Sequence, residues 1–168
     1  MESQYKNIKK SLDISPDKLD QHILQTVESE IRERYEKTCD KRYGLLISID
    51  RFVSVENFIS KDSSSVTFTV TFDATTFNPV KGMEIVFKPT SIISRGVFGK
   101  LYDRIFLFIP DSFMGSDWIY AGEGGGDGGF FSNKKTKKSI RIGCDTKARI
   151  VEIRYEIVKY NCICSINI

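Results

Sequence analysis

The sequence has little of what catalytic and metal sites require. Its only histidine is His22, and its four cysteines are Cys39, Cys144, Cys162 and Cys164. No C-x-x-C pair occurs, and Cys162 and Cys164 stand two apart in an expected strand, where they share a face and cannot complete a tetrahedral zinc site alone. We therefore expect no metal and no cofactor, reduced buried thiols, and a partly buried structural His22 rather than a catalytic base.

Long apolar runs are also absent. No stretch approaches the roughly 20 apolar residues of a membrane helix, and residues 1–13, MESQYKNIKKSLD, are polar and hold no signal-peptide segment. We expect neither a transmembrane nor a secreted protein. The chain of 168 residues is nonetheless 40% hydrophobic, which is enough for a core in one large domain or two small ones.

The net charge of +3 is unevenly distributed. Residues 1–79 carry 11 Lys and Arg against 13 Asp and Glu, whereas residues 80–168 carry 14 against 9. An acidic half joined to a basic half indicates two surfaces with different partners, and the basic half is the candidate for nucleic acid.

The first half has the pattern of a small α+β domain. Residues 6–14 suit a first edge strand, and Ser15-Pro16-Asp17 is typical of a helix start. An apolar stripe with a spacing of four predicts one long amphipathic helix over 17–37. Residues 42–55 and the alternation of apolar residues with threonine over 66–73 then predict antiparallel strands, with the domain ending near Phe77.

The second half is patterned as strands throughout. Five short strands within residues 80–168, the first over 83–93 and the last over 158–168, predict a small closed barrel rather than a sandwich. The Gly-rich segment 122–129 interrupts them and is followed by four lysines within 134–138. A phosphate-binding loop is one interpretation, but GxxxxGK[ST] is absent, and we expect a mobile loop between barrel strands that touches nucleic-acid backbone without sequence preference.

The order of these segments resembles the RNA polymerase stalk subunit family, which includes the seventh subunit of RNA polymerase II and its archaeal counterpart. The segments that carry the resemblance are YEKTCDKRYGLLISI (35–49), SSSVTFTVTFDATTFNPVKGMEI (63–85), SRGVFGKL (94–101), IFLFIPDSFM (105–114) and SIRIGCDTKARIVEI (139–153). The resemblance implies an α+β tip domain over 1–79, in which one long helix lies on an antiparallel sheet, and an all-β, five-stranded OB-type barrel over 80–168.

The function that the resemblance implies is not enzymatic. The chain would be a structural component of a DNA-directed RNA polymerase that docks near the clamp, pairs with a second stalk subunit of the fourth-subunit family, and contacts single-stranded transcript during initiation and elongation. Its location would be nuclear in a cell, or a cytoplasmic viral factory or virion for a virus; which polymerase it serves stays open. The alternative is a free-standing OB-fold RNA-binding adaptor in translation or RNA decay.

Two sets of residues follow as candidate sites. RNA contact needs exposed aromatic and cationic side chains on a barrel face; the alternatives are core packing for the aromatics and simple solubility for the cations. The RNA-binding candidates are Phe98, Lys100, Tyr102, Arg104, Phe106, Lys147 and Arg149. The partner-docking candidates, which rest on the resemblance, are Cys39, Tyr43, Gly44, Phe77, Pro79 and Gly82, of which the last three also suit a role in fixing the domain junction.

Overall fold

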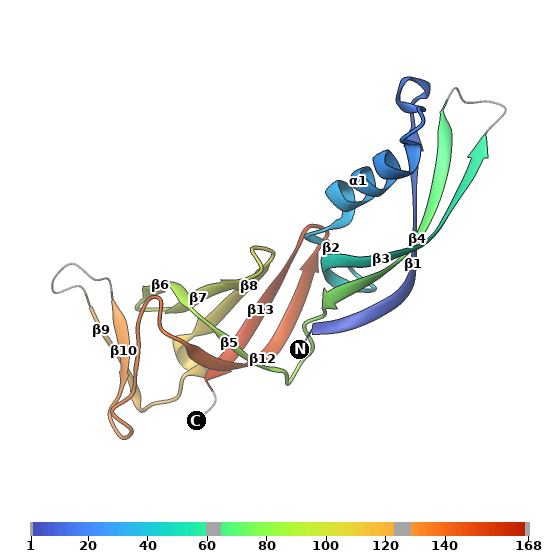
Figure 1. Cartoon of the computed structure of the whole chain (residues 1–168). Helices are drawn as coiled ribbons and strands as arrows, with labels where there is room; N and C mark the ends of the chain where they lie inside the picture. Colours follow the sequence, from blue (N-terminus) through green and yellow to red (C-terminus); the bar gives the residue numbers. More distant parts are fainter. Residues whose placement is uncertain (1, 60–64, 123–128, 167–168) are drawn as a thin grey trace. The chain divides into compact units, whose positions relative to one another are not determined.

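The chain folds into two compact units, Met1–Asn78 and Pro79–Ile168, termed here the N-terminal and C-terminal units. A computed structural model describes residues 2–59, 65–122 and 129–166 (Figure 1). Within these ranges no helix is long and apolar enough to cross a membrane.

The N-terminal unit is built on one antiparallel sheet. Its strands are β1 (Glu2–Ile14), β2 (Thr38–Asp40), β3 (Gly44–Ile59) and β4 (Val66–Phe77), in the order β1-β4-β3-β2. In β4 the predicted alternation is visible, because Phe68, Val70 and Phe72 are buried while Thr67 and Thr69 are partly exposed. The prediction of one helix with antiparallel strands is confirmed for this unit.

The helix is shorter than predicted. After Ser15 the chain makes only a 3-10 turn, η1 (Pro16–Lys18), and α1 runs over Ile23–Tyr35 rather than 17–37. The Ser15 side chain makes no capping hydrogen bond, and a second turn intervenes in which the Asp20 carboxylate accepts a hydrogen bond from the His22 N–H at 2.8 Å. His22 is exposed, so its predicted partial burial is wrong.

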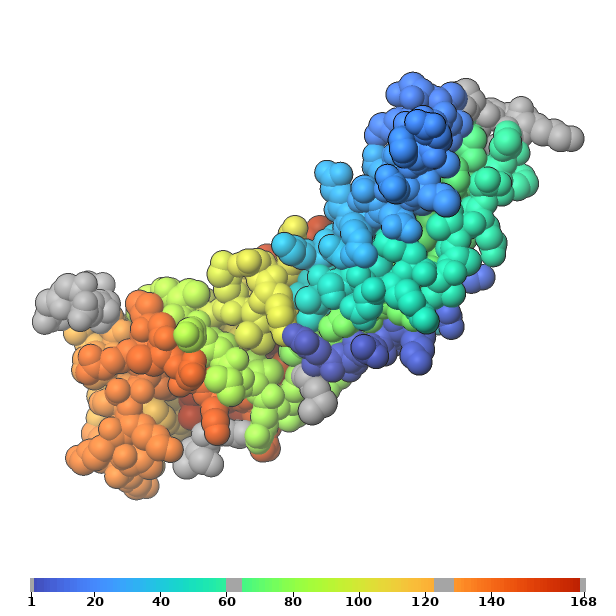
Figure 2. All heavy atoms as spheres, in the orientation of Figure 1, coloured from blue at the N-terminus to red at the C-terminus, as the bar shows by residue number. Residues whose placement is uncertain are grey.

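One face of α1 forms the core with the sheet. Val27 and Ile31 are completely buried, one helical turn apart, together with Ile8 of β1 and Phe72 of β4. In the space-filling view the helix atoms lie directly against those of β3 (Figure 2). This packing, rather than the cap signals, sets the helical segment.

A charged contact ties the two edge strands of this sheet together. Lys10 Nζ of β1 donates to Asp40 Oδ2 of β2 at 2.9 Å, and the lysine also lies over the rings of Tyr35 and Tyr43, at 5.3 and 5.9 Å. Burial alone would raise the pKa of Asp40. The hydrogen bonds from Lys10 and from the backbone N–H of Arg42 outweigh that effect, so the pKa of Asp40 is lowered.

The C-terminal unit contains a six-stranded sheet. Its strands are β5 (Glu84–Phe87), β6 (Pro89–Ile93), β7 (Gly96–Leu101), β8 (Ile105–Pro110), β12 (Thr146–Glu156) and β13 (Lys159–Ile166). They lie in the order β5-β12-β13-β8-β7-β6, and every neighbouring pair is antiparallel except β13 and β8, which are parallel. The edge strands β5 and β6 are separated in the chain by Lys88 alone.

The strand count differs from the five that the sequence predicts. The segment 83–93, expected as one strand, is divided at Lys88 into β5 and β6, which pair with different neighbours. A second, three-stranded sheet holds β9 (Trp118–Ala121), β10 (Phe130–Asn133) and β11 (Ser139–Ile140), in the order β11-β10-β9. The described part of this unit therefore has nine strands.

The lysines of 134–138 belong to a closed turn between β10 and β11. The Asn133 Oδ1 atom accepts hydrogen bonds from the backbone N–H groups of Lys135 and Thr136, both at 2.9 Å, as in an Asx turn. Most of the Gly-rich segment, 123–128, lies outside the described residues, so the expected loop there stays a prediction.

Candidate nucleic-acid interface

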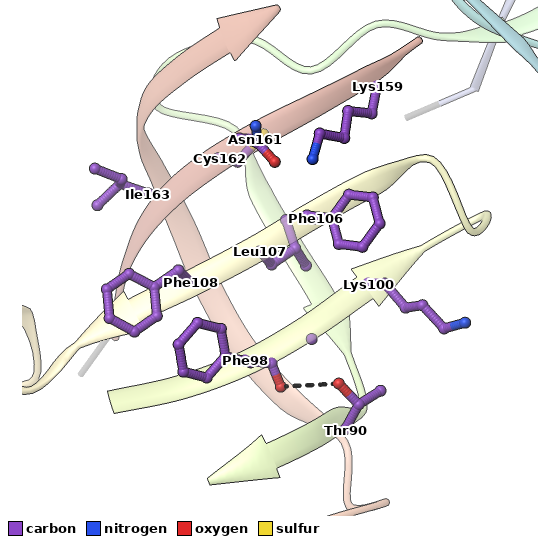
Figure 3. A pocket seen from close by; sticks show the side chains of 11 residues that line it. Thr90, Phe98, Lys100, Phe106, Leu107, Phe108, Lys159, Asn161, Cys162 and Ile163 are labelled. Carbon is purple, nitrogen blue, oxygen red and sulfur yellow. Dashed lines mark hydrogen bonds between the residues drawn. The ribbon is translucent and has the colours of Figure 1, made fainter. Parts of the chain in front are cut away.

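Three adjacent strands of the C-terminal unit, β7, β8 and β13, present two rows of outward side chains (Figure 3). The strand registers place Lys100, Phe106 and Asn161 in one row, and Phe98, Phe108 and Ile163 in the other. The intervening residues of each strand point inward, as the burial of Val97, Leu107 and Cys162 shows. The rows line a groove of about 440 Å³.

The groove is mainly aromatic. The Phe98 and Phe108 rings are stacked, with centroids 4.5 Å apart and planes inclined by 24°. Phe98 is nevertheless 38% exposed and Phe106 42% exposed, so both rings are open to solvent. Flat, exposed rings on a rigid sheet are the kind of surface on which unpaired bases stack.

Two lysines border the aromatic rings. Lys100 Nζ pairs with Asp103 at 2.5 Å, while Lys159 Nζ lies 5.2 Å from the Phe106 ring centroid and 3.5 Å from Glu156. Ion pairs this exposed contribute only about 0–1 kcal/mol, so exchanging a carboxylate for a phosphate costs little. Stacking surface and cations are thus combined in one groove.

The structure brings together three of the predicted RNA-binding residues and separates the others. Phe98, Lys100 and Phe106 line the groove. Tyr102 and Arg104 lie in the hairpin turn between β7 and β8, where Tyr102 and Asp103 adopt positive φ angles of 50° and 59°, and neither Tyr102 nor Arg104 is among the residues lining the groove.

The two predicted cations on β12 also lie apart from the groove. Arg149 pairs with Glu84 of β5 at 3.0 Å, and Lys147 lines a second pocket of about 240 Å³ together with Trp118 and Lys138. RNA contact by any of the seven residues stays a prediction.

Sequence reasoning missed Phe108, Lys159 and Asn161. Phe108 lies in the run Ile105–Pro110, IFLFIP, in which inward and outward positions are both apolar and the alternation is hidden. Lys159 and Asn161 reach the groove only because β13 pairs with β8, whose partner residues lie 55 positions earlier in the chain. The sequence predicted a strand over 158–168 but not which strand lies beside it.

Most of the predicted partner-docking residues have structural roles. Gly44 and Phe77 are buried, as is Pro79, and the Gly82 N–H donates to the Ile150 carbonyl at 2.7 Å. Gly44 and Gly82 have φ angles of +81° and +83°, which favour glycine.

Cys39 and Tyr43 are the partly exposed members of that set. Cys39 is half-buried in β2, and the Tyr43 ring meets Tyr5 edge-on, with centroids 5.4 Å apart. Both line a pocket of about 240 Å³ in the N-terminal unit. Contact with a partner stays a prediction for all six.

The buried thiols have no feature of catalytic cysteines. Burial raises the pKa values of Cys162 and Cys164 to about 12, so both remain protonated at neutral pH. Among the described residues, no three His, Cys, Asp or Glu side chains gather as a possible metal site.

In the N-terminal unit, one strand is followed by the helix and then by the remaining strands of the same sheet. Residues 9–65 match the family model described as "SHS2 domain found in N terminus of Rpb7p/Rpc25p/MJ0397". The match therefore assigns an SHS2-type domain to residues 9–65 within the N-terminal unit. This match confirms the predicted relationship to the RNA polymerase stalk subunit family. A search of curated proteins found no match.

Proposed function

We propose that this protein is a non-catalytic stalk subunit of a DNA-directed RNA polymerase. The N-terminal unit would dock near the clamp and, with a second stalk subunit of the fourth-subunit family, position the C-terminal unit for contact with emerging RNA. The protein would act in initiation and elongation, wherever its polymerase works: the nucleus, a viral factory or a virion. The match over residues 9–65 carries the polymerase assignment.

We further propose that the C-terminal unit is an OB-type barrel. Three features of its sheet support this: β5 and β6 are consecutive in the chain yet lie at opposite ends of the strand order, β12 pairs with β5, and β13 and β8 are parallel. Barrels of this type bind oligonucleotides on the face of their second and third strands, which correspond here to β7 and β8.

The groove on β7, β8 and β13 is the observation that supports RNA binding. Stacking of a base on an aromatic ring is worth about 1–3 kcal/mol, which corresponds to about 5- to 150-fold in affinity. The two lysines beside the rings add a salt-dependent attraction for phosphate.

Filter binding of a single-stranded RNA at low and high salt tests the RNA contact. We expect Phe98→Ala to weaken binding about 5- to 150-fold. Lys100→Glu should also reduce the salt slope by about 0.7, the value for one phosphate contact on a single strand. Phe113→Ala and Lys81→Glu are matched controls, since both residues are exposed and neither lines the groove. Unchanged affinity in both groove variants would remove these residues from the site.

Assembly is tested separately by affinity purification of the tagged protein and mass spectrometry of what it recovers. We expect polymerase core subunits and a second stalk subunit. Recovery of translation or RNA-decay factors in place of both would overturn the stalk assignment and favour a free-standing adaptor.

A further inference from the structure

Asn161 is one of two uncharged polar side chains in a groove whose other lining residues are apolar or cationic. Thr90 is a second uncharged polar residue there, but its Oγ1 already donates to the Phe98 carbonyl at 3.5 Å. The Asn161 carboxamide makes no hydrogen bond with any residue that the structure describes. It is partly exposed, so it faces the groove with its full donor and acceptor capacity.

Asn161 lies beside Phe106, where its carboxamide can reach a base that stacks on the phenylalanine ring. The two residues are register partners on the parallel strands β13 and β8, whose backbones run about 5 Å apart. Figure 3 shows Asn161 between Lys159 and Ile163 along β13, next to the strand that carries Phe106 and Phe108. A base that stacks on Phe106, displacing the Lys159 ammonium, therefore brings its edge within reach of the carboxamide.

The chemistry of a carboxamide suits a base edge better than a phosphate. Asparagine offers one acceptor and one donor side by side, and base edges present matching pairs of donors and acceptors, whereas phosphate oxygens only accept. The lysines already provide donors for phosphate. The Asn161 carboxamide can therefore accept one hydrogen bond from a base and donate another to it.

We propose that Asn161 reads the edge of a base stacked on Phe106, so that the C-terminal unit discriminates among the bases of single-stranded RNA. This inference rests on the proposed RNA-binding function. Phe98, Phe108 and the lysines then supply affinity without sequence preference, and Asn161 supplies selectivity.

The test compares binding of fluorescent 12-nucleotide rA, rU and rC oligomers by fluorescence anisotropy. A bidentate contact is worth about 1–3 kcal/mol of discrimination, so the wild type should bind its best oligomer at least about fivefold more tightly than its worst. Asn161→Leu should bring the ratio to within about twofold while leaving the salt slope unchanged. Thr90→Val is the control and should keep the wild-type ratio.

The possible outcomes distinguish failure of base discrimination by Asn161 from failure of the proposed RNA binding. Wild-type protein that binds all three oligomers equally, or an Asn161→Leu variant that keeps the ratio, overturns the reading by Asn161 and leaves RNA binding intact. Failure to bind any oligomer at low salt overturns both. A thermal melt of Asn161→Leu that matches the wild type excludes misfolding as the cause of a lost ratio.

Discussion

Replacement of Gly44 by alanine should selectively destabilise the N-terminal unit. Gly44 has a φ of +81°, and a Cβ built there would lie 2.4 Å from the Phe77 carbonyl oxygen and 2.7 Å from the Asn78 Cα. Both atoms belong to the backbone, so neither can rotate away as a side chain would. The left-handed conformation costs an alanine about 1–2 kcal/mol, and overpacking adds about 1–3 kcal/mol.

The expected loss of about 2–5 kcal/mol is measurable by thermal unfolding. In a domain of 60–100 residues, 1 kcal/mol shifts Tm by about 4–8 °C, so the lower bound already lowers Tm by about 8–16 °C. Two probes separate the units. The helical signal at 222 nm reports on α1 in the N-terminal unit, and the single tryptophan, Trp118, reports by fluorescence on the C-terminal unit.

Gly82→Ala is the matched control for the steric part of this effect. Gly82 has nearly the same φ, +83°, but a Cβ there would meet nothing within 4 Å. We expect only the conformational cost of about 1–2 kcal/mol, seen in the tryptophan signal. If Gly44→Ala lowers the 222 nm Tm no more than Gly82→Ala lowers that of the fluorescence, the close approach to Phe77 is not a constraint and the reasoning is refuted.

Two further predictions concern titratable groups. At pH 8 a thiol with a pKa of about 12 is ionised in about one molecule in 10⁴. Iodoacetamide should therefore modify the exposed Cys144 rapidly and modify Cys162 and Cys164 only after unfolding. Equal modification rates in the native protein would contradict the burial of Cys162 and Cys164. Because the folded pKa of Asp40 lies below its unfolded value of about 3.9, its stabilising contribution is present above pH 4 and is lost as pH falls through the folded pKa. Asp40→Asn should therefore lower Tm at pH 7 but converge with the wild type towards pH 3, and a Tm difference that does not depend on pH would argue against the Lys10 contact.

The strands of the N-terminal unit could be predicted because their signal is local. Alternation over Val66–Phe77 has the period of a strand with one buried face, and the structure buries that face. The helix start could not be predicted in the same way. Ser15-Pro16 has the composition of a helix N-cap. The helix residues that are buried against the sheet, however, are Val27 and Ile31, so packing places the helix further along the chain.

The candidate groove was only partly predictable. Phe98 and Lys100 share a strand face in any register, so their proximity follows from sequence spacing alone. The outward direction of that face did not follow, since Val97 and Phe98 are both apolar and either suits a core. The contributions of Asn161 and Lys159 depend on the parallel pairing of β13 with β8, which no local pattern specifies.

The sequence by itself determined the division near Pro79, the acidic and basic halves, and the strand character of most segments, because composition and residue period are local properties. Only the tertiary structure decided which aromatic rings reach solvent and which polar side chain lies beside them. Strand pairing sets both, and pairing is fixed by contacts between residues far apart in the chain. It brings Phe98, Phe106 and Asn161 into one groove.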